Sequence, residues 1–181
     1  RIQPFRQGRH GAGADRFRER AARAEAAAGR RIDWVGRIPG DRRILDPLDL
    51  RATYLEGFEP HRGGRMAHAW EGPFDTAPIH GSADWAGGGL VSDTDDLATF
   101  VQALIGGRVI AEPWLAEVLR YEFRTLDPAL HTPGYLGYGL GVDARESNGF
   151  LLRGHRGHWG VLMHHDPRSG LTITGTIDQA H

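Results

Sequence analysis

The 181-residue sequence contains no cysteine and no lysine. Without cysteine, the chain has no disulfide, no thiol chemistry and no thiolate zinc site. Without lysine, all 22 basic residues are arginine, and every catalytic motif that requires a lysine is excluded. The first absence removes the thiol-based functions, and the second restricts the hydrolase chemistry considered below.

A net charge and a long apolar run are also missing. The 22 basic and 23 acidic residues leave a formal net charge of −1, which directs the chain neither to nucleic acid nor to a membrane surface. No apolar run approaches the length of a membrane span, and no signal-peptide core follows the arginine-rich start. These absences leave the compartment open. Because the chain opens on Arg1 rather than methionine, we expect a fragment or a processed product.

The length suits one domain or a large piece of a bigger one. Residues 1–43 form a poorly defined segment rich in arginine, alanine and glycine. Strong helix formers fill Ala14–Ala28, but Phe17 is their only large apolar neighbour, so a helix there would bury little. Three interpretations of this segment stay open: a solvated helix, a disordered arm and a basic arm that binds nucleic acid. The acidic residues of the segment make the nucleic-acid arm the least favoured of the three. Apolar content rises from Ile44, which predicts a second region over residues 44–181.

The clearest helix signal lies between Gly87 and Gly107. Ser92 is predicted as the N-cap, and aspartates follow it in the first turn. Five apolar residues at helical spacing predict a helix over Ser92–Ile105 with one face buried against the final sheet: Leu97, Phe100, Val101, Leu104 and Ile105. A second helix is predicted over Pro113–Tyr121, with Pro113 in its first turn.

Short apolar or alternating runs in Phe150–Asp178 are separated by clusters of Gly, Pro and Asp, which predicts consecutive antiparallel strands. In the final run, Leu171, Ile173 and Ile177 share one face and three threonines share the other. Tyr138–Val142 is predicted as a further strand that feeds this sheet. Together these elements predict the α/β fold class, with an antiparallel sheet flanked by helices.

The run Arg153–Gly160 reads RGHRGHWG and places three glycines along one strand and its exit. Glycine in a strand weakens it and often marks a close approach by a ligand or by another backbone. Two interpretations stay open at this point: a strand edge that meets a ligand, and a bulged edge with surface histidines.

Ten histidines raise the question of a metal site. His155 and His158 are three residues apart around a glycine turn, whereas the adjacent His164 and His165 would point to opposite faces of a strand. No H-E-x-x-H motif occurs, so we predict no metal and no other cofactor, and a histidine metal hydrolase ranks last. No G-x-S-x-G elbow occurs either, so the serines are interpreted as loop or capping residues.

Four stretches, in this order and spacing, are similar to motifs of one enzyme superfamily. Their patterns are I-x-x-P-L-G-L-x-x-T, A-G-G-L-x-S-T-x-x-D-L-x-x-F, Y-G-L-G-W/V and G-H-x-G-x-x-P-G, which match residues 44–54, 87–100, 138–142 and 154–160. Asp49 replaces a usual glycine, and Trp159 stands where proline is usual. Ile44–Ile177 therefore resembles the C-terminal part of the serine β-lactamase/D,D-peptidase superfamily, in the class C branch that includes D-alanyl-D-alanine carboxypeptidases and related esterases.

The resemblance implies a partial β-lactamase/transpeptidase-like domain and a site with three parts: a Ser-x-x-Lys pair, a Tyr-x-Asn loop and a Lys/His-x-Gly strand. Only the third part is matched, by His155, Arg156 and Gly157. The small Gly157 would let an acyl group approach, and the backbone N–H of His158 would donate to the oxyanion. His155 would bind a substrate carboxylate or relay a proton, and Arg156 would contact the substrate.

The other two parts are missing, since no lysine is present and none of the four tyrosines is followed by x-Asn. We therefore expect the rear part of a serine hydrolase whose full-length parent cleaves an amide or ester of a small molecule or peptide, and which is inactive alone. The alternative is a non-catalytic remnant or binding module that keeps the pocket wall. Residues 1–30, and as far as Asp41, are interpreted as an out-of-frame or decayed reading of the lost Tyr-x-Asn region.

Overall fold

The computed structural model describes residues 41–76, 87–121 and 133–179. All of them belong to one unit of the chain, Pro39–His181. The interpretation of residues 1–40 as a weakly packed arm, including the helix over Ala14–Ala28, lies outside the described residues. The predicted boundary between residues 43 and 44 therefore stays a prediction.

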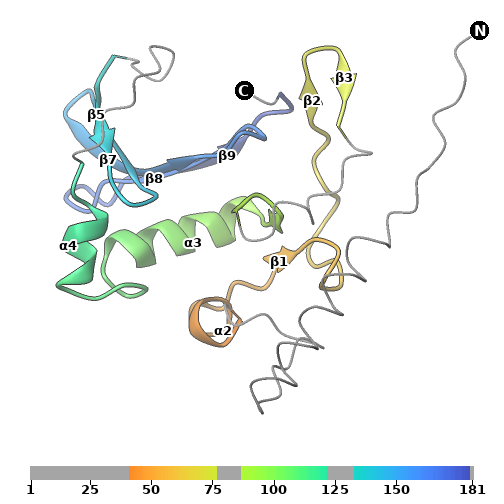
Figure 1. Ribbon diagram of the computed structural model, residues 1–181, viewed down its shortest axis with the longest axis horizontal. Coiled ribbons are helices and arrows are strands. Elements are labelled where there is room, and N and C mark those ends of the chain that lie inside the picture. Colours follow the sequence, from red (N-terminus) through yellow and green to blue (C-terminus); the bar gives the residue numbers. More distant parts are fainter. Residues whose placement is uncertain (1–40, 77–86, 122–132, 180–181) are drawn as a thin grey trace, which may run out of the picture. The chain divides into compact units, whose positions relative to one another are not determined.

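The described elements are short helices and strands followed by one larger sheet (Figure 1). In chain order they are η1 (Asp41–Leu45), α2 (Asp46–Leu48), β1 (Tyr54–Leu55), β2 (Trp70–Glu71), β3 (Phe74–Asp75), β4 (Leu90–Val91), α3 (Thr94–Ile105), α4 (Trp114–Val118), β5 (Tyr135–Tyr138), β6 (Asp143–Ser147), β7 (Phe150–Arg156), β8 (Val161–His165) and β9 (Thr172–Thr176).

Strands β5 to β9 form one antiparallel sheet in which each strand pairs with its neighbour in sequence. Helix α3 packs against β8 and β9, and Figure 1 shows it lying along one side of the sheet. Two further antiparallel pairs, β1 with β4 and β2 with β3, lie outside this sheet. The predicted fold class, an antiparallel sheet flanked by helices, is confirmed.

The helix predicted over Ser92–Ile105 is present, but it begins at Thr94 and its N-cap is Asp93. Asp93 Oδ1 accepts a hydrogen bond from the N–H of Asp96 at 2.8 Å. The predicted cap, Ser92, instead shares a hydrogen bond of 2.9 Å between its hydroxyl and that of Thr53. The cap prediction was wrong by one residue because a distant hydroxyl competes for Ser92.

The apolar stripe of α3 is buried over part of its width. Val101 and Ile105 are buried and form a core with Val142 of the sheet, in line with the prediction. Leu97, Phe100 and Leu104, which were predicted to be buried, are only partly covered. The described part of the sheet thus covers a narrower band of the helix than the spacing of apolar residues predicted.

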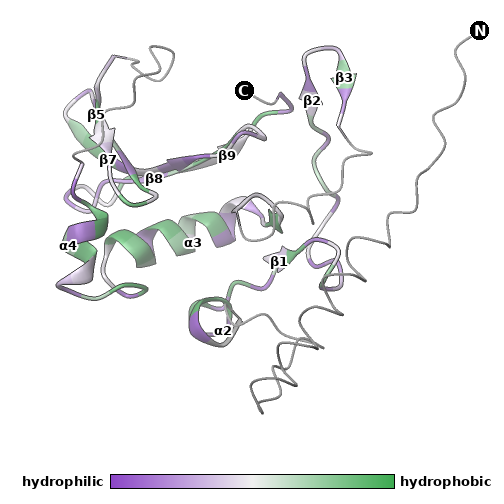
Figure 2. Ribbon diagram, viewed as in Figure 1, coloured by the Kyte–Doolittle hydropathy of each residue, from purple (hydrophilic) through white to green (hydrophobic). Residues whose placement is uncertain are grey.

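The alternation predicted for the final run is confirmed over β9, but its threonine face meets the helix. Thr172 Oγ1 accepts a hydrogen bond from Gln102 Nε2 at 2.9 Å, and Thr174 Oγ1 donates to the carbonyl of Thr94 at 3.1 Å. Ile173 is 41% exposed on the opposite face. Figure 2 shows the same contrast, with apolar turns along α3 and hydrophilic stretches along β9.

Two predicted elements need correction. The second helix is shorter than predicted, since α4 begins after its N-cap Pro113 and ends at Val118. The predicted strand Tyr138–Val142 is wrong, because β5 ends at Tyr138 and residues 139–141 turn the chain into β6. A Cβ on Gly139 would lie 2.1 Å from the carbonyl oxygen of Val118, so this glycine serves a close backbone contact with the end of α4.

Candidate functional site

The H-x-G tripeptide lies at the end of β7. His155 and Arg156 belong to the strand, and Gly157 follows directly after it. Arg156 is paired in register with Leu162 of β8, and the N–H of Gly157 donates to the carbonyl of Val161 at 2.8 Å. His155 and Gly157 were expected on one strand antiparallel to the strand near Val161. This is confirmed for His155, whereas Gly157 lies one residue beyond the end of β7 and keeps only the hydrogen bond to Val161.

One edge of this strand end is open. Strand β6 pairs with β7 only as far as Gly154, whereas β8 continues along it to Arg156. Since backbone groups alternate in direction along a strand and Gly157 donates toward β8, the N–H and C=O of Arg156 face away from β8. Within the described ranges, no backbone hydrogen bond is made by Arg156 on that side or by His158, which lies in the turn after β7. The open edge is defined here as the backbone of residues 155–158.

The turn after the open edge is held in place by the C-terminal strand. The N–H of Gly160 donates to the carbonyl of Gly157 at 3.2 Å, and the carbonyl of Gly160 accepts from the N–H of Ile177 at 3.0 Å. Gly160 has a φ of +78°, and a Cβ on it would lie 2.6 Å from two carbonyl oxygens. The fold itself therefore requires glycine at position 160, and the two hydrogen bonds hold the turn that contains His158.

Gly157 differs from the glycines on either side of it. A Cβ there would meet only Val161, at an ordinary contact distance of 3.8 Å. At Gly154, by contrast, a Cβ would lie 1.8 Å from the carbonyl oxygen of Met163. The described part of the chain does not itself fill the space beside Gly157. That this space holds a ligand stays a prediction.

His155 is half-buried beside Tyr138, with ring centroids 5.9 Å apart in an edge-to-face arrangement. Burial lowers the pKa of the His155 imidazole below its usual value. The carboxylate of Asp143 partly opposes this shift, whereas His164 and Arg156 add to it. His155 is thus suited to act as a neutral hydrogen-bonding or proton-accepting group at neutral pH.

The sequence analysis missed a buried, hydrogen-bonded pair, Asp143 and His164, next to this strand. Asp143 Oδ1 lies 2.6 Å from His164 Nε2, and Arg145 Nε donates to Asp143 Oδ2 at 3.0 Å. Asp143 is 4% exposed and His164 is 5% exposed. Burial opposes ionisation of Asp143, but the hydrogen bonds and charges of His164 and Arg145 outweigh it and hold the carboxyl pKa below its ordinary value.

The strand register explains how this pair forms. Asp143 is paired with Gly154, and Gly154 is paired with His164, so the three residues form one row across β6, β7 and β8. Because Gly154 has no side chain, the carboxylate and the imidazole can meet across the middle strand. The glycine at Gly154 was the available signal, but only the register shows which two side chains it brings together.

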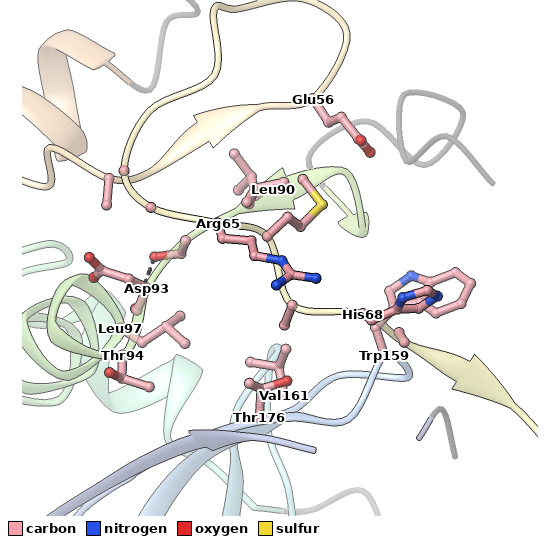
Figure 3. A pocket seen from close by; sticks show the side chains of 18 of the residues that line it. Glu56, Arg65, His68, Leu90, Asp93, Thr94, Leu97, Trp159, Val161 and Thr176 are labelled. Carbon is pink, nitrogen blue, oxygen red and sulfur yellow. Dashed lines mark hydrogen bonds between the residues drawn. The ribbon is translucent and has the colours of Figure 1, made fainter. Parts of the chain in front are cut away.

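A cavity of about 450 Å³ lies near the same turn (Figure 3). Its walls come from the loop after β1, from β4 and the start of α3, and from β8 and β9. Trp159 and Val161 line it, but the predicted site residues His155, Arg156, Gly157 and His158 do not. The sequence analysis did not identify this cavity.

The described residues contain no group of three or more His, Asp or Glu side chains placed to hold a metal ion. His165 Nδ1 lies 2.9 Å from Thr172 Oγ1, so the two adjacent histidines have separate partners. In the same parts of the chain, no helix has both the length and the apolar character needed to cross a bilayer.

Comparison with known proteins gives the following matches. The Beta-lactamase family model matches residues 41–181. The D-stereospecific amidohydrolase from Streptomyces sp. is 29% identical with a TM-score of 0.61, over 81% of this chain and 45% of that protein. The D-amino acid amidase from Ochrobactrum anthropi SV3 is 23% identical with a TM-score of 0.61, over 77% of this chain and 43% of the amidase.

A penicillin binding protein from Bacillus halodurans also has the same fold, at 15% identity and a TM-score of 0.52 over 78% of this chain and 44% of that protein. The chain thus spans less than half the length of each of these proteins. No curated protein matches the sequence.

Proposed function

The chain belongs to the beta-lactamase family, and we propose that the edge of its strand β7 forms one wall of a serine-hydrolase-like site. The reaction of the full-length parent is cleavage of an amide or ester through an acyl-enzyme. The similar structures named as a D-stereospecific amidohydrolase and a D-amino acid amidase favour an amide of a D-amino acid or D-peptide. The observation that carries this proposal is the open edge at residues 155–158.

Each residue of the open edge has a distinct part in the proposed reaction. The N–H of His158 donates to the developing oxyanion, a contact whose removal typically costs about 2.7–4 kcal/mol of transition-state stabilisation. The neutral imidazole of His155 hydrogen-bonds the substrate or relays a proton. Gly157 keeps the acyl group within reach of the edge, and Arg156 contacts the substrate.

The nucleophile must come from outside this sequence. A serine activated by a lysine one helical turn away cannot be present in a chain without lysine, and Tyr-x-Asn is also absent. The isolated chain is therefore a site wall rather than a catalyst, and its substrates are those of the longer parent.

Activity assays on the isolated chain test the proposal. We expect no hydrolysis of a chromogenic cephalosporin, a p-nitrophenyl ester or D-phenylalanine amide above background, and no labelling by a fluorescent penicillin. A labelled serine would overturn the claim that the nucleophile is absent. When the chain is extended upstream through a Ser-x-x-Lys segment, activity should appear, and His155→Ala should lower kcat/KM at least about tenfold.

The absence of lysine also favours a second function, a non-catalytic module that keeps the pocket wall. Reading the DNA upstream of codon 1 in all three frames separates the two. A Ser-x-x-Lys segment in the same gene supports the hydrolase, whereas an in-frame start near Arg1 supports the binding module.

A further inference from the structure

The cavity of about 450 Å³ beside the open edge has mainly apolar walls. Its volume lies within the usual range of small-molecule pockets. Figure 3 shows side chains from the β1 loop, the start of α3 and the ends of β8 and β9 directed toward one space. The apolar side chains among them are Met66, Leu90, Leu97, Trp159, Val161 and Ile177.

One arginine differs from the other basic side chains that line this cavity. Arg62 is held by the Glu59 carboxylate at 2.8 Å, and His61 lies 2.8 Å from the Tyr54 hydroxyl. His68 is likewise engaged, through Asp75. Arg65 has no ion pair or hydrogen bond with any residue in the described ranges, and Figure 3 shows its guanidinium pointing into the middle of the cavity.

The acidic residues of the cavity do not neutralise Arg65. The Asp93 carboxylate is used as the cap of α3, where it accepts the N–H of Asp96 at 2.8 Å. Figure 3 shows Glu56 apart from Arg65, although both belong to the loop after β1, and draws no hydrogen bond between them. Two hydroxyl groups also line the cavity, that of Thr94 at the start of α3 and that of Thr176 at the end of β9. The cavity thus combines one unpaired cation with apolar walls and hydroxyl groups.

We propose that this cavity binds the carboxylate of a small ligand that has an apolar body, with Arg65 as the carboxylate-binding residue. A guanidinium presents two parallel N–H donors that match the two oxygens of a carboxylate. Arg65 is exposed, so its guanidinium is accessible to a ligand that enters the cavity. The apolar body of the ligand then lies against Leu90, Leu97 and Val161.

The position of the cavity connects it with the open edge. Trp159, which lines the cavity, directly follows His158, the proposed oxyanion donor. A substrate of the parent hydrolase that also reached this cavity would carry a carboxylate. This assignment of substrate class rests on the proposed function, whereas binding of the carboxylate in the cavity does not.

Binding of 3-phenylpropionate and of its neutral amide, 3-phenylpropionamide, to the whole chain tests the inference. Titrations followed by NMR at the Trp159 indole N–H and the Thr176 amide should show the acid binding about tenfold more tightly than the amide. Arg65→Gln should remove this preference by weakening only the acid. Arg51→Gln is the matched control, since Arg51 is an exposed arginine outside the cavity that pairs with Asp49.

Equal affinity for acid and amide, or acid binding that survives Arg65→Gln, would overturn the inference. The titration requires no hydrolysis, so its result is separate from the activity assays. If the acid does not bind while the extended enzyme cleaves amides, the carboxylate site is wrong and the hydrolase proposal stands. If the acid binds as expected and the extended enzyme is inactive, only the hydrolase proposal is rejected.

Discussion

At the scale of single residues, three glycines in one short run have three different physical roles. Gly154 is fixed by backbone atoms of β8, and Gly160 is fixed by a positive φ and two carbonyl oxygens. Gly157 has neither constraint. The sequence shows only that all three lack a side chain, and their packing separates the two that the fold requires from the one that leaves space.

Gly154→Ala should destabilise the chain by about 3 kcal/mol or more, because its Cβ would lie 1.8 Å from the Met163 carbonyl oxygen and 2.8 Å from His164 Cα. Urea unfolding measures the loss. Gly175→Ala in β9 is the matched control, since no atom lies within 4 Å of its added Cβ, and it should change stability by no more than about 0.5 kcal/mol. A loss below about 1 kcal/mol for Gly154→Ala would show that β7 and β8 can move apart locally.

Asp49 illustrates how a departure from a motif can be accommodated. It stands where the resembling family usually has glycine, and its backbone adopts φ 57° and ψ 39°, the left-handed conformation that closes α2. Glycine adopts this conformation freely, and Asp is among the few other residues that visit it routinely. The substitution therefore keeps the turn at a small cost in backbone energy.

At the scale of elements, helices and strands that depend on local sequence patterns were predicted well, whereas those that depend on contacts with distant residues were not. The apolar spacing and aspartates of Ser92–Ile105 predicted α3 because both act within one helix. The strand order β7, β8 and β9 followed from short runs divided by turn residues. The strand predicted over Tyr138–Val142 failed because its glycines serve a contact with α4, which lies far away in sequence.

For the candidate site, too, the sequence predicted the local motif but not the contacts between distant residues. The motif located His155, Gly157 and His158 on a strand end, and the register now shows that this end has an open edge. The hydrogen-bonded pair of Asp143 and His164 could not be predicted, because it depends on which residues of β6 and β8 face each other across Gly154. The same holds for the cavity, whose walls come from four separate parts of the chain.

The start of α3 provides a test at this scale. Asp93→Ala should destabilise the chain by about 1 kcal/mol because it leaves the N–H of Asp96 without its acceptor. Asp93→Ser should recover most of the loss, since serine is also a good cap. Hydrogen exchange of the Asp96 amide should become faster in Asp93→Ala and stay unchanged in Ser92→Ala. Faster exchange in Ser92→Ala alone would restore Ser92 as the cap.

At the scale of the whole molecule, shifted pKa values limit stability on both sides of neutrality. His155 has a pKa below the ordinary 6.5, so the unfolded chain binds a proton first and stability falls as pH drops below about 6.5. Asp143 and Asp166 have pKa values below 3.8, so their contributions are lost as pH falls below that value.

On the alkaline side, burial raises the pKa values of Tyr54, Tyr121 and Tyr138, and the value of Tyr121 rises from 10.0 to about 12. The charge interactions of Tyr121 with Arg153 and Asp143 act in opposite directions, the first lowering and the second raising the pKa. Above about pH 10 the unfolded chain loses the phenolic proton while the folded chain keeps it. Unfolding is then favoured as pH rises toward 12.

Tyr121→Phe should therefore reduce the loss of stability between pH 9 and pH 11. Among the described residues, the Tyr121 hydroxyl is buried and has no hydrogen-bond partner, so its removal should leave stability at pH 7 unchanged or slightly higher. Tyr54→Phe is the control at pH 7, where it should lower stability. The Tyr54 hydroxyl lies 2.8 Å from His61 Nδ1, so its removal should cost about 1 kcal/mol at this pH. Thermal unfolding of both variants across this pH range measures these effects, and a large loss at pH 7 in Tyr121→Phe would show that its hydroxyl has a partner in solution.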